Sequence, residues 1–341
     1  MTRPQPNRSS AKGTSEMSVR VAFVGTGVIA NHAHFGAMRE IADVEIVGMC
    51  DVDPAKAEVA AAAHGGQVYV DYREMLDKEK PEALFVCVPP FAHSDIELEA
   101  VKRGVHLFVE KPVSLSMERA LRTRDAISDA GVICAVGYHW RYNSLIEEAR
   151  LRLQEMEIPL VLGYWVGGMP PAPWWRVKSK SGGQHVEQTT HIFDLARYIL
   201  GEASVVFAMG HKGMMQESYE DHDIEDATTV TVGFRNGTVG NFTSADYVRS
   251  AGKVGLYIYA DQLVMELDLK GVKVAEPGVV TERTHPERAH YVQDRAFIDA
   301  VRSGDASGVR SSYDDAVRTL EITLAADESM KAGKPVAVGN L

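Results

Sequence analysis

The amino-acid sequence predicts an α/β domain with a doubly wound parallel sheet, followed by an α+β domain with a large, mainly antiparallel sheet. The chain has 341 residues, more than the roughly 100–200 residues of a usual single domain. From Val19 to about Gly137, short β-branched runs alternate with helix-forming stretches, which is the pattern of parallel strands joined by helices. After about residue 140, strand-like runs follow one another with few helices between them, which favours an antiparallel sheet.

We therefore divide the chain into a polar N-terminal arm at 1–17, a first domain at 18–140 and a second domain at 141–341. The predicted strands of the first domain are VRVAFV, VEIVGM, ALFVCV, HLFVE and VICAVG. Between them, apolar residues recur at helical spacing, and this predicts helices at 54–63, 95–103 and 116–130.

The second domain is predicted to begin with a helix at 144–154 and a strand near 160–167. A loop rich in Pro, Trp and Gly follows at 169–183. The strand-like runs from 204 to 274 are VVFAM, TVTVGF, GTVGNFT, GLYIYA and LVMELDL. Asn236-Gly237 predicts a hairpin turn, because this pair suits the backbone of tight two-residue turns. Helices are expected at 286–302 and 313–331.

Composition excludes several classes of protein. The net charge of −11 disfavours nucleic acid as a main partner. No run of about 18 apolar residues predicts a membrane span, and the polar leader does not resemble a secretory signal, so we expect a cytoplasmic protein. The three cysteines stand singly in apolar runs, and we expect buried thiols rather than a disulfide or zinc framework.

A glycine motif follows the first predicted strand. Gly25, Gly27 and Ala30 form GxGxxA at the start of a helix, where they permit a tight turn, close approach of a pyrophosphate and close helix packing. The second strand ends in Asp51, which suits the ribose hydroxyls of a dinucleotide. Val52 stands where an arginine would hold a 2′-phosphate, so NAD is favoured over NADP. We assign cofactor contacts in the loop to Gly25, Thr26, Gly27, Val28 and Ile29.

Two further strand ends are expected beside the cofactor, because doubly wound sheets bind ligands beyond the carboxyl ends of their strands. One reads VCVPPFAH and the other FVEKP. A lysine held there by the following proline suits a developing negative charge on a substrate oxygen. The predicted contacts are Val88, Pro89, His93, Glu110 and Lys111.

Taken together, these motifs resemble the glucose-fructose oxidoreductase, inositol dehydrogenase and rhizopine catabolism family (Gfo/Idh/MocA). GxGxxA, Asp51, VPPFAH, EKP, GYHWRYN and GGQHVEQTTHIFD occur in the family order. The resemblance implies a Rossmann domain, hydride transfer between a nicotinamide and a carbon of a sugar or cyclitol, and a homo-oligomer, either a dimer or a tetramer. It also implies that Lys111 contacts the reacting hydroxyl and that His191 is the general acid/base.

The motif around His191 departs from the family pattern G-G-G-x-L-x-D-x-G-x-H-x-x-D. Ser181, His185, Glu187 and Thr189 replace its first Gly, Leu, Asp and next Gly. These departures affect the substrate assignment more than the general chemistry.

Glu187, His191 and Asp194 are spaced to share one face of a helix that begins after Gly182-Gly183. Histidine suits proton transfer near neutrality, and we predict Lys111, His191 and Glu187 as the catalytic residues. Asp194 is expected to be structural. A metal held by His185, Glu187, His191 and Asp194 is the alternative, but the spacing differs from HExxH, and we predict no metal. The acidic segment 217–226 lacks the spacing of a calcium loop.

The expected substrate is a small polyol. Trp174, Trp175 and Arg176 are predicted to form an aromatic wall with a polar donor, or else to anchor the loop on the core. By resemblance, Tyr138, His139 and Arg141 bound the cofactor and substrate pocket. The remaining predicted substrate contacts are Lys111, Glu187, Gln188 and His191.

Two other functions fit the same motifs. A lyase or glycoside-cleaving enzyme would oxidise its substrate transiently and regenerate NAD in each cycle. A nucleotide-sensing regulator would bind NAD without catalysis, and the retention of Lys111 and His191 argues against it. NAD-dependent oxidation of a sugar, sugar derivative or cyclitol is our preferred prediction.

Overall fold

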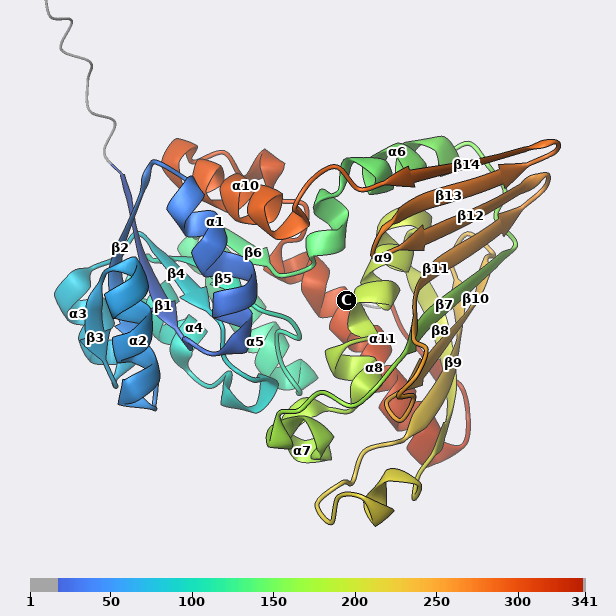
Figure 1. The fold of residues 1–341 in the computed structure, drawn as a ribbon, viewed down its shortest axis with the longest axis horizontal. Helices are drawn as coiled ribbons and strands as arrows, with labels where there is room; N and C mark the ends of the chain where they lie inside the picture. The colour runs from blue at the N-terminus through green and yellow to red at the C-terminus, as the bar shows by residue number, and fades with distance from the viewer. Residues whose placement is uncertain (1–17, 340–341) are drawn as a thin grey trace, which may run out of the picture.

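The computed structural model describes residues 18–339, which form two domains side by side (Figure 1). The predicted arm at 1–17 lies outside the described residues. Each domain is built on its own sheet, one of six strands and one of nine. The predicted fold class is confirmed.

The six-stranded sheet is parallel and has the order β3-β2-β1-β4-β5-β6. Its central strands are almost wholly buried, as expected for a sheet covered on both faces. The strand order reverses between β1 and β4, and a ligand cleft opens at such a point beyond the carboxyl ends of the strands. The strands are β1 (Val19–Val24), β2 (Val44–Cys50), β3 (Gln67–Tyr69), β4 (Ala83–Val86), β5 (His106–Val109) and β6 (Cys134–Val136).

Helices cover the faces of this sheet. The one after the glycine motif starts as a π-helical segment and continues as a regular helix. The next helix is fixed at its start by Asp53, which accepts a hydrogen bond from the Ala55 amide, and by Pro54 at its first position. The bounds are η1 (Ala30–His34), α1 (Phe35–Glu40), α2 (Pro54–His64), α3 (Tyr72–Glu79), η2 (Pro90–Ala92), α4 (Ile96–Val101), α5 (Met117–Ala130) and η3 (His139–Tyr142).

The nine-stranded sheet has the order β14-β13-β12-β11-β7-β10-β9-β8-β15. Its neighbours are antiparallel except for β7 and β10, which are parallel. The predicted turn at Asn236-Gly237 joins β9 to β10, and Gly237 has a φ of +92°. The strands are β7 (Leu160–Val166), β8 (Ala203–His211), β9 (Ala227–Phe234), β10 (Val239–Ala245), β11 (Lys253–Ala260), β12 (Leu263–Asp268), β13 (Gly271–Glu276), β14 (Val279–Thr284) and β15 (Val336–Ala337).

One face of the large sheet is covered by helices, of which α9 is almost entirely buried. Phe193 on α9 packs on Phe242 of β10 with ring centroids 4.5 Å apart. A side chain at Gly163 would meet Phe242 at 2.4 Å, so this close packing needs glycine. The elements are α6 (Ser144–Leu153), η4 (Pro173–Arg176), α7 (Lys178–Ser181), α8 (Gln184–Glu187), α9 (Thr190–Leu200), η5 (Met215–Glu217), α10 (Ala289–Ser303), η6 (Ala306–Gly308) and α11 (Tyr313–Ala332).

The last two long helices return toward the first domain. In Figure 1, α10 lies beside α1, and its Phe297 joins the core formed by Phe23 and Phe85. Helix α11 contacts both α5 and β8. The boundary predicted at residue 140 separates the two sheets, but the core of the first domain also includes residues from 289–303.

The structure also bears on the cysteines and on membrane-spanning helices. The three cysteines are free and buried, as predicted. Within residues 18–339, every helix is too short or too polar to cross a membrane.

Candidate active site

The glycine motif forms an open turn directly after β1. Gly25 has a φ of +87°, and a side chain there would meet the Cys87 carbonyl at 2.5 Å, so both conformation and space require glycine. A side chain at Gly27 would meet nothing within 4 Å, which leaves room above the turn. The Thr26 amide and hydroxyl donate to Asp51 at 2.9 and 3.2 Å. The chain thus offers an open glycine cradle with a carboxylate at its rim.

This cradle fits NAD better than NADP. Asp51 keeps its carboxylate half-buried at the end of β2, next to Val52, whose side chain is 94% exposed. A carboxylate at this position accepts hydrogen bonds from ribose hydroxyls and repels a 2′-phosphate. Val28, Ile29, Val88 and Pro89 surround the turn; Val28 is exposed and the other three are half-buried.

Lys111 links the two domains at the cleft. Its Nζ lies 2.7 Å from Glu187 Oε1 and 2.7 Å from the Glu187 carbonyl oxygen. The other carboxylate oxygen of Glu187 accepts a hydrogen bond of 2.9 Å from Trp175 Nε1. The side chains of Lys111 and Glu187 are only 11% and 13% exposed, so solvent screens this pair weakly. Glu187 therefore fixes the lysine ammonium from the second domain.

The predicted single helix over Glu187, His191 and Asp194 is broken. Helix α8 ends at Glu187, and α9 begins at Thr190. Thr189 lies at the break, where its hydroxyl bonds Ser244 of β10 at 2.7 Å. The prediction of one continuous helix was wrong, since a turn at Gln188 and Thr189 separates α8 from α9. Glu187 and His191 nevertheless stay close to Lys111.

His191 is enclosed by aromatic and imidazole rings. Its ring lies 5.7 Å from that of Trp165, 5.8 Å from Tyr138 and 4.9 Å from His139. His139 in turn stacks on His290 of α10 at 4.0 Å. His191 is 6% exposed, and its Nδ1 has no hydrogen-bond partner among residues 18–339.

The surroundings of His191 keep its imidazole neutral. Burial, followed by the charge of Lys111 and by His139 and His290, holds the pKa of His191 well below its ordinary value. Burial likewise lowers the pKa of His290 to about 4. A neutral imidazole beside a fixed ammonium can accept a proton while the ammonium stabilises an oxyanion.

Glu110 is buried beneath the active site, where it bonds His34 instead of a cofactor. His34 Nε2 lies 3.1 Å from Glu110 Oε1, and His34 Nδ1 lies 2.9 Å from Asp294 Oδ2. Burial alone would lower the pKa of His34, but Asp294 raises it well above its ordinary value. A side chain at Gly137 would meet Glu110 Oε1 at 2.6 Å. We therefore correct the assignment of Glu110 to cofactor binding, since its carboxylate is 4% exposed and bonds His34.

Arg141 also departs from its predicted place in the pocket. Its guanidinium binds both oxygens of Asp194, at 2.8 and 2.6 Å, and Asp315 at 2.6 Å. Arg141 is 3% exposed, so it has no free face for a ligand. Asp194 is structural, as expected, because Thr319 donates to the same carboxylate at 3.0 Å.

The aromatic wall is only partly formed. Trp175 is 1% exposed and donates a hydrogen bond to Glu187, so it anchors the loop instead of facing substrate. Arg176 turns to Asp221 at 2.5 Å. Tyr138 is buried and bonds the Thr190 hydroxyl at 2.9 Å. Trp174 stays half-buried. Trp175 thus fits the alternative prediction of a loop anchor, while Tyr138 and Arg176 are engaged with partners in the protein.

His93 and His185 are both buried, and each lies next to a carboxylate. His93 Nδ1 lies 2.6 Å from Glu97 Oε1, and His185 Nε2 lies 3.0 Å from Asp327 Oδ1. His93 thus bonds a helix of its own domain through Nδ1, while its buried Nε2 has no hydrogen-bond partner among residues 18–339. The four side chains weighed as a metal site are not brought together, because His185 and the structural aspartate each have other partners.

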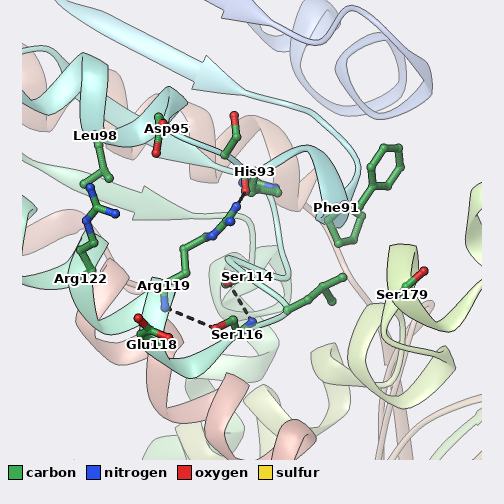
Figure 2. Close-up of a pocket in the computed structure, with 13 residues that line it drawn as sticks. Phe91, His93, Asp95, Leu98, Ser114, Ser116, Glu118, Arg119, Arg122 and Ser179 are labelled. Carbon is green, nitrogen blue, oxygen red and sulfur yellow. Dashed lines mark hydrogen bonds between the residues drawn. The ribbon is translucent and has the colours of Figure 1, made fainter.

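A cavity of about 360 Å³ lies next to this region, between the loop after β4, the start of α5 and helix α7. In Figure 2, Arg119 reaches across it toward His93, whose carbonyl oxygen accepts a hydrogen bond from the guanidinium. Phe91 and Ser179 line it from the two domains. Lys111, Glu187 and His191 do not line this cavity.

Sequence reasoning missed the residues that support the site. Asp294 bonds His34, and His290 stacks on His139, only because α10 folds back onto the first domain. His34 in turn bonds Glu110 within the first domain. No local spacing indicates these contacts. The sequence predicted a helix at 286–302 but gave no indication of what it packs against.

A dinucleotide cradle in one domain, together with an ammonium and an imidazole held partly by a second domain, defines a two-domain NAD-binding oxidoreductase. Comparison with known families agrees. Residues 19–138 match the model described as the oxidoreductase family with an NAD-binding Rossmann fold, and residues 158–263 match the GFO/IDH/MocA C-terminal domain. The chain belongs to the Gfo/Idh/MocA family, and NAD is its cofactor.

Several relatives match over nearly their whole length. scyllo-Inositol 2-dehydrogenase (NAD(+)) of Bacillus subtilis is 26% identical over 340 residues, covering 94% of this chain and 96% of the relative. Myo-inositol 2-dehydrogenase of Thermotoga maritima is also 26% identical, covering 93% and 98%. The structure of levoglucosan dehydrogenase with NADH and levoglucosan has a TM-score of 0.85 at 20% identity, covering 95% of this chain and 100% of that one.

Proposed function

We propose that this protein is an NAD-dependent dehydrogenase that oxidises a hydroxyl-bearing carbon of a sugar, sugar derivative or cyclitol. The observation that carries the proposal is the fixed Lys111 ammonium, 2.7 Å from Glu187 Oε1, beside the neutral imidazole of His191. The relatives named as inositol dehydrogenases support a polyol substrate.

Oxidation of an alcohol releases a hydride from carbon and a proton from oxygen. Bound NAD supplies the hydride acceptor. In the proposed reaction Lys111 donates a hydrogen bond to the substrate oxygen and stabilises its negative charge. His191 accepts the hydroxyl proton, which its lowered pKa permits at neutral pH. Glu187 acts through Lys111 by holding the ammonium in place.

We propose a smaller set of cofactor and substrate contacts than the motifs alone suggested. We assign the cofactor to Gly25, Thr26, Gly27, Val28, Ile29, Asp51, Val88 and Pro89. We assign the substrate to Lys111, His139, Gln188 and His191, with Trp174 at the rim. The polar character of this second set favours a substrate with several hydroxyl groups.

A panel of sugars and cyclitols, each incubated with NAD or NADP, tests the proposal through the absorbance of the reduced nicotinamide. We expect at least one polyol to reduce NAD faster than NADP. His191→Asn should then lower kcat by about 10²–10⁴-fold, the usual contribution of a general acid or base, and leave the Kd of NAD unchanged. A chain that turns over a polyol without accumulating NADH would instead be a lyase. A chain that binds NAD and turns over nothing would refute catalysis.

A homo-oligomer, either a dimer or a tetramer, and a cytoplasmic location stay predictions. The uncovered face of the nine-stranded sheet supports the first, because it exposes apolar side chains. Leu160, Phe207 and Val239 are 40%, 37% and 49% exposed there. Light scattering on the purified chain measures the subunit number, and a monomer would contradict the prediction.

A further inference from the structure

A second group of buried ionisable side chains lies apart from the active site. His222 and Asp226 belong to the segment between β8 and β9, and Asp246 directly follows β10. All three residues are at most 1% exposed. His222 Nε2 lies 3.3 Å from Asp246 Oδ2 and 3.9 Å from Asp226 Oδ1. Three possible metal ligands from two segments thus lie within 4.8 Å of one another.

Across the described residues, the carboxylates around His222 have no lysine or arginine beside them, unlike the neighbouring carboxylates Glu225 and Asp327. There, Lys178 Nζ lies 2.8 Å from Glu225 Oε2 and 2.6 Å from Asp327 Oδ1, so an ammonium already balances two carboxylates. Among residues 18–339, no lysine or arginine pairs with the two buried aspartates around His222. Two buried carboxylates without a matched cation are unfavourable, because the interior solvates charge poorly.

One carboxylate oxygen also has no partner. Asp246 Oδ1 is buried and has no hydrogen bond in the described part of the chain. Asp226, in contrast, is held in place by the Met214 and Met215 amides at 2.8 and 3.0 Å. A buried acceptor left unpaired is rare in proteins. An ion that Asp246 binds through both carboxylate oxygens would satisfy it.

We propose that His222, Asp226 and Asp246 form a binding site for one divalent ion of the zinc class. One imidazole and two carboxylates are ligands that Zn²⁺ accepts, at about 2.0–2.2 Å. Ligands at that distance in a tetrahedron lie roughly 3.3 Å apart, close to the shorter of the two separations around His222. His211, whose Nδ1 lies 3.4 Å from Asp226 Oδ2, is the candidate for the fourth ligand.

The ion would fix the β8–β9 segment, which contacts the loop at 169–183. Asp221 of this segment pairs with Arg176 at 2.5 Å, and Asp223 accepts a hydrogen bond from the Lys178 amide. The loop at 169–183 also carries Trp175, which donates a hydrogen bond to Glu187. A metal that joins the β8–β9 segment to the end of β10 therefore braces one wall of the cleft without touching the reacting atoms.

The test measures Zn²⁺ bound to the full chain after treatment with a chelator and dialysis against buffer containing Zn²⁺. We expect one Zn²⁺ per chain in the wild type, determined by elemental analysis. Asp246→Asn should weaken Zn²⁺ binding at least about tenfold, since it removes a charged ligand. Asp327→Asn, which removes a carboxylate from the group that Lys178 already neutralises, is the matched control and should bind Zn²⁺ like the wild type.

A second measurement on the wild type covers the case in which a variant does not fold. Substituting Co²⁺ for Zn²⁺ should give the visible absorption of a four-coordinate site, and bound ion should protect 212–226 from proteolysis. A wild type that binds no ion at saturating Zn²⁺ overturns the proposal. Equal Zn²⁺ affinity of Asp246→Asn and wild type overturns it as well, as does an ion that leaves the cleavage of 212–226 unchanged.

Discussion

The substitution Glu187→Gln tests how the lysine is positioned. The amide keeps the shape of the side chain and still offers an oxygen to Trp175 Nε1, but it removes the negative charge 2.7 Å from Lys111 Nζ. The Glu187 carbonyl oxygen remains as a second acceptor at 2.7 Å. The ammonium should therefore stay in the cleft, with fewer constraints on its position.

The expected effect follows from the strength of the lost interaction. Hydrogen bonds to charged groups contribute about 1.5–3 kcal/mol, against about 0.5–1.5 kcal/mol for neutral ones. The pair is only 11% and 13% exposed, so little is lost to screening. A difference of about 1–2 kcal/mol, expressed fully in the transition state, corresponds to a decrease in kcat of roughly 5- to 30-fold.

The assay is the initial rate of NADH formation with the best polyol of the panel at saturation, together with the Kd of NAD. The Kd should not change, because Glu187 lies outside the glycine cradle. Trp175→Phe, which removes the other partner of the same carboxylate, is the control and should lower kcat less. If Glu187→Gln keeps kcat within about twofold of the wild type, the carboxylate does not position Lys111, and the reasoning is refuted.

Three further predictions concern neighbouring groups. Lys111→Met should raise the pKa of His191 toward its ordinary value, because the ammonium is second only to burial in lowering it; an NMR titration that shows no upward shift would count against the proposed geometry. Gly137→Ala should lower the free energy of unfolding in urea by about 1–3 kcal/mol, since the methyl group would crowd the buried carboxylate of Glu110, and an unchanged stability would contradict this. Asp51→Ser should reduce the preference for NAD over NADP by about tenfold in kcat/KM, because a charge that repels the 2′-phosphate is lost; an unaltered ratio would argue that other groups select the cofactor.

Much of the fold follows from local patterns in the sequence. The β-branched runs gave the inner strands of the first sheet, and Asn236-Gly237 gave the turn between β9 and β10. Strand β3 was not predicted, because it has three residues and little buried apolar surface. The return of α10 to α1 was not predicted either, since the contact of Phe297 with Phe23 and its neighbours joins segments far apart in the chain.

In the candidate site, the motif residues were predicted from the sequence, but the partners of the buried charges were not. Motifs indicated Lys111 and His191, because strand ends and helix starts place such side chains at a cleft. The partners of buried charges were not visible in the sequence. Arg141 reads as a pocket residue, yet its guanidinium binds Asp194, and Glu110 bonds a histidine of η1. Which carboxylate meets which cation depends on how the helices pack, and spacing along the chain carries no information about it.

The docking of α10 has a consequence for how the protein is made. A ribosome releases the six strands of the first sheet long before it releases 289–303, yet Phe297 and Ile298 complete the core beneath those strands. Domains that fold during synthesis usually do so from the N-terminus onward. Here the core of the first domain stays incomplete, with apolar surface uncovered, until 289–303 has emerged, so the two domains should reach their mature form together.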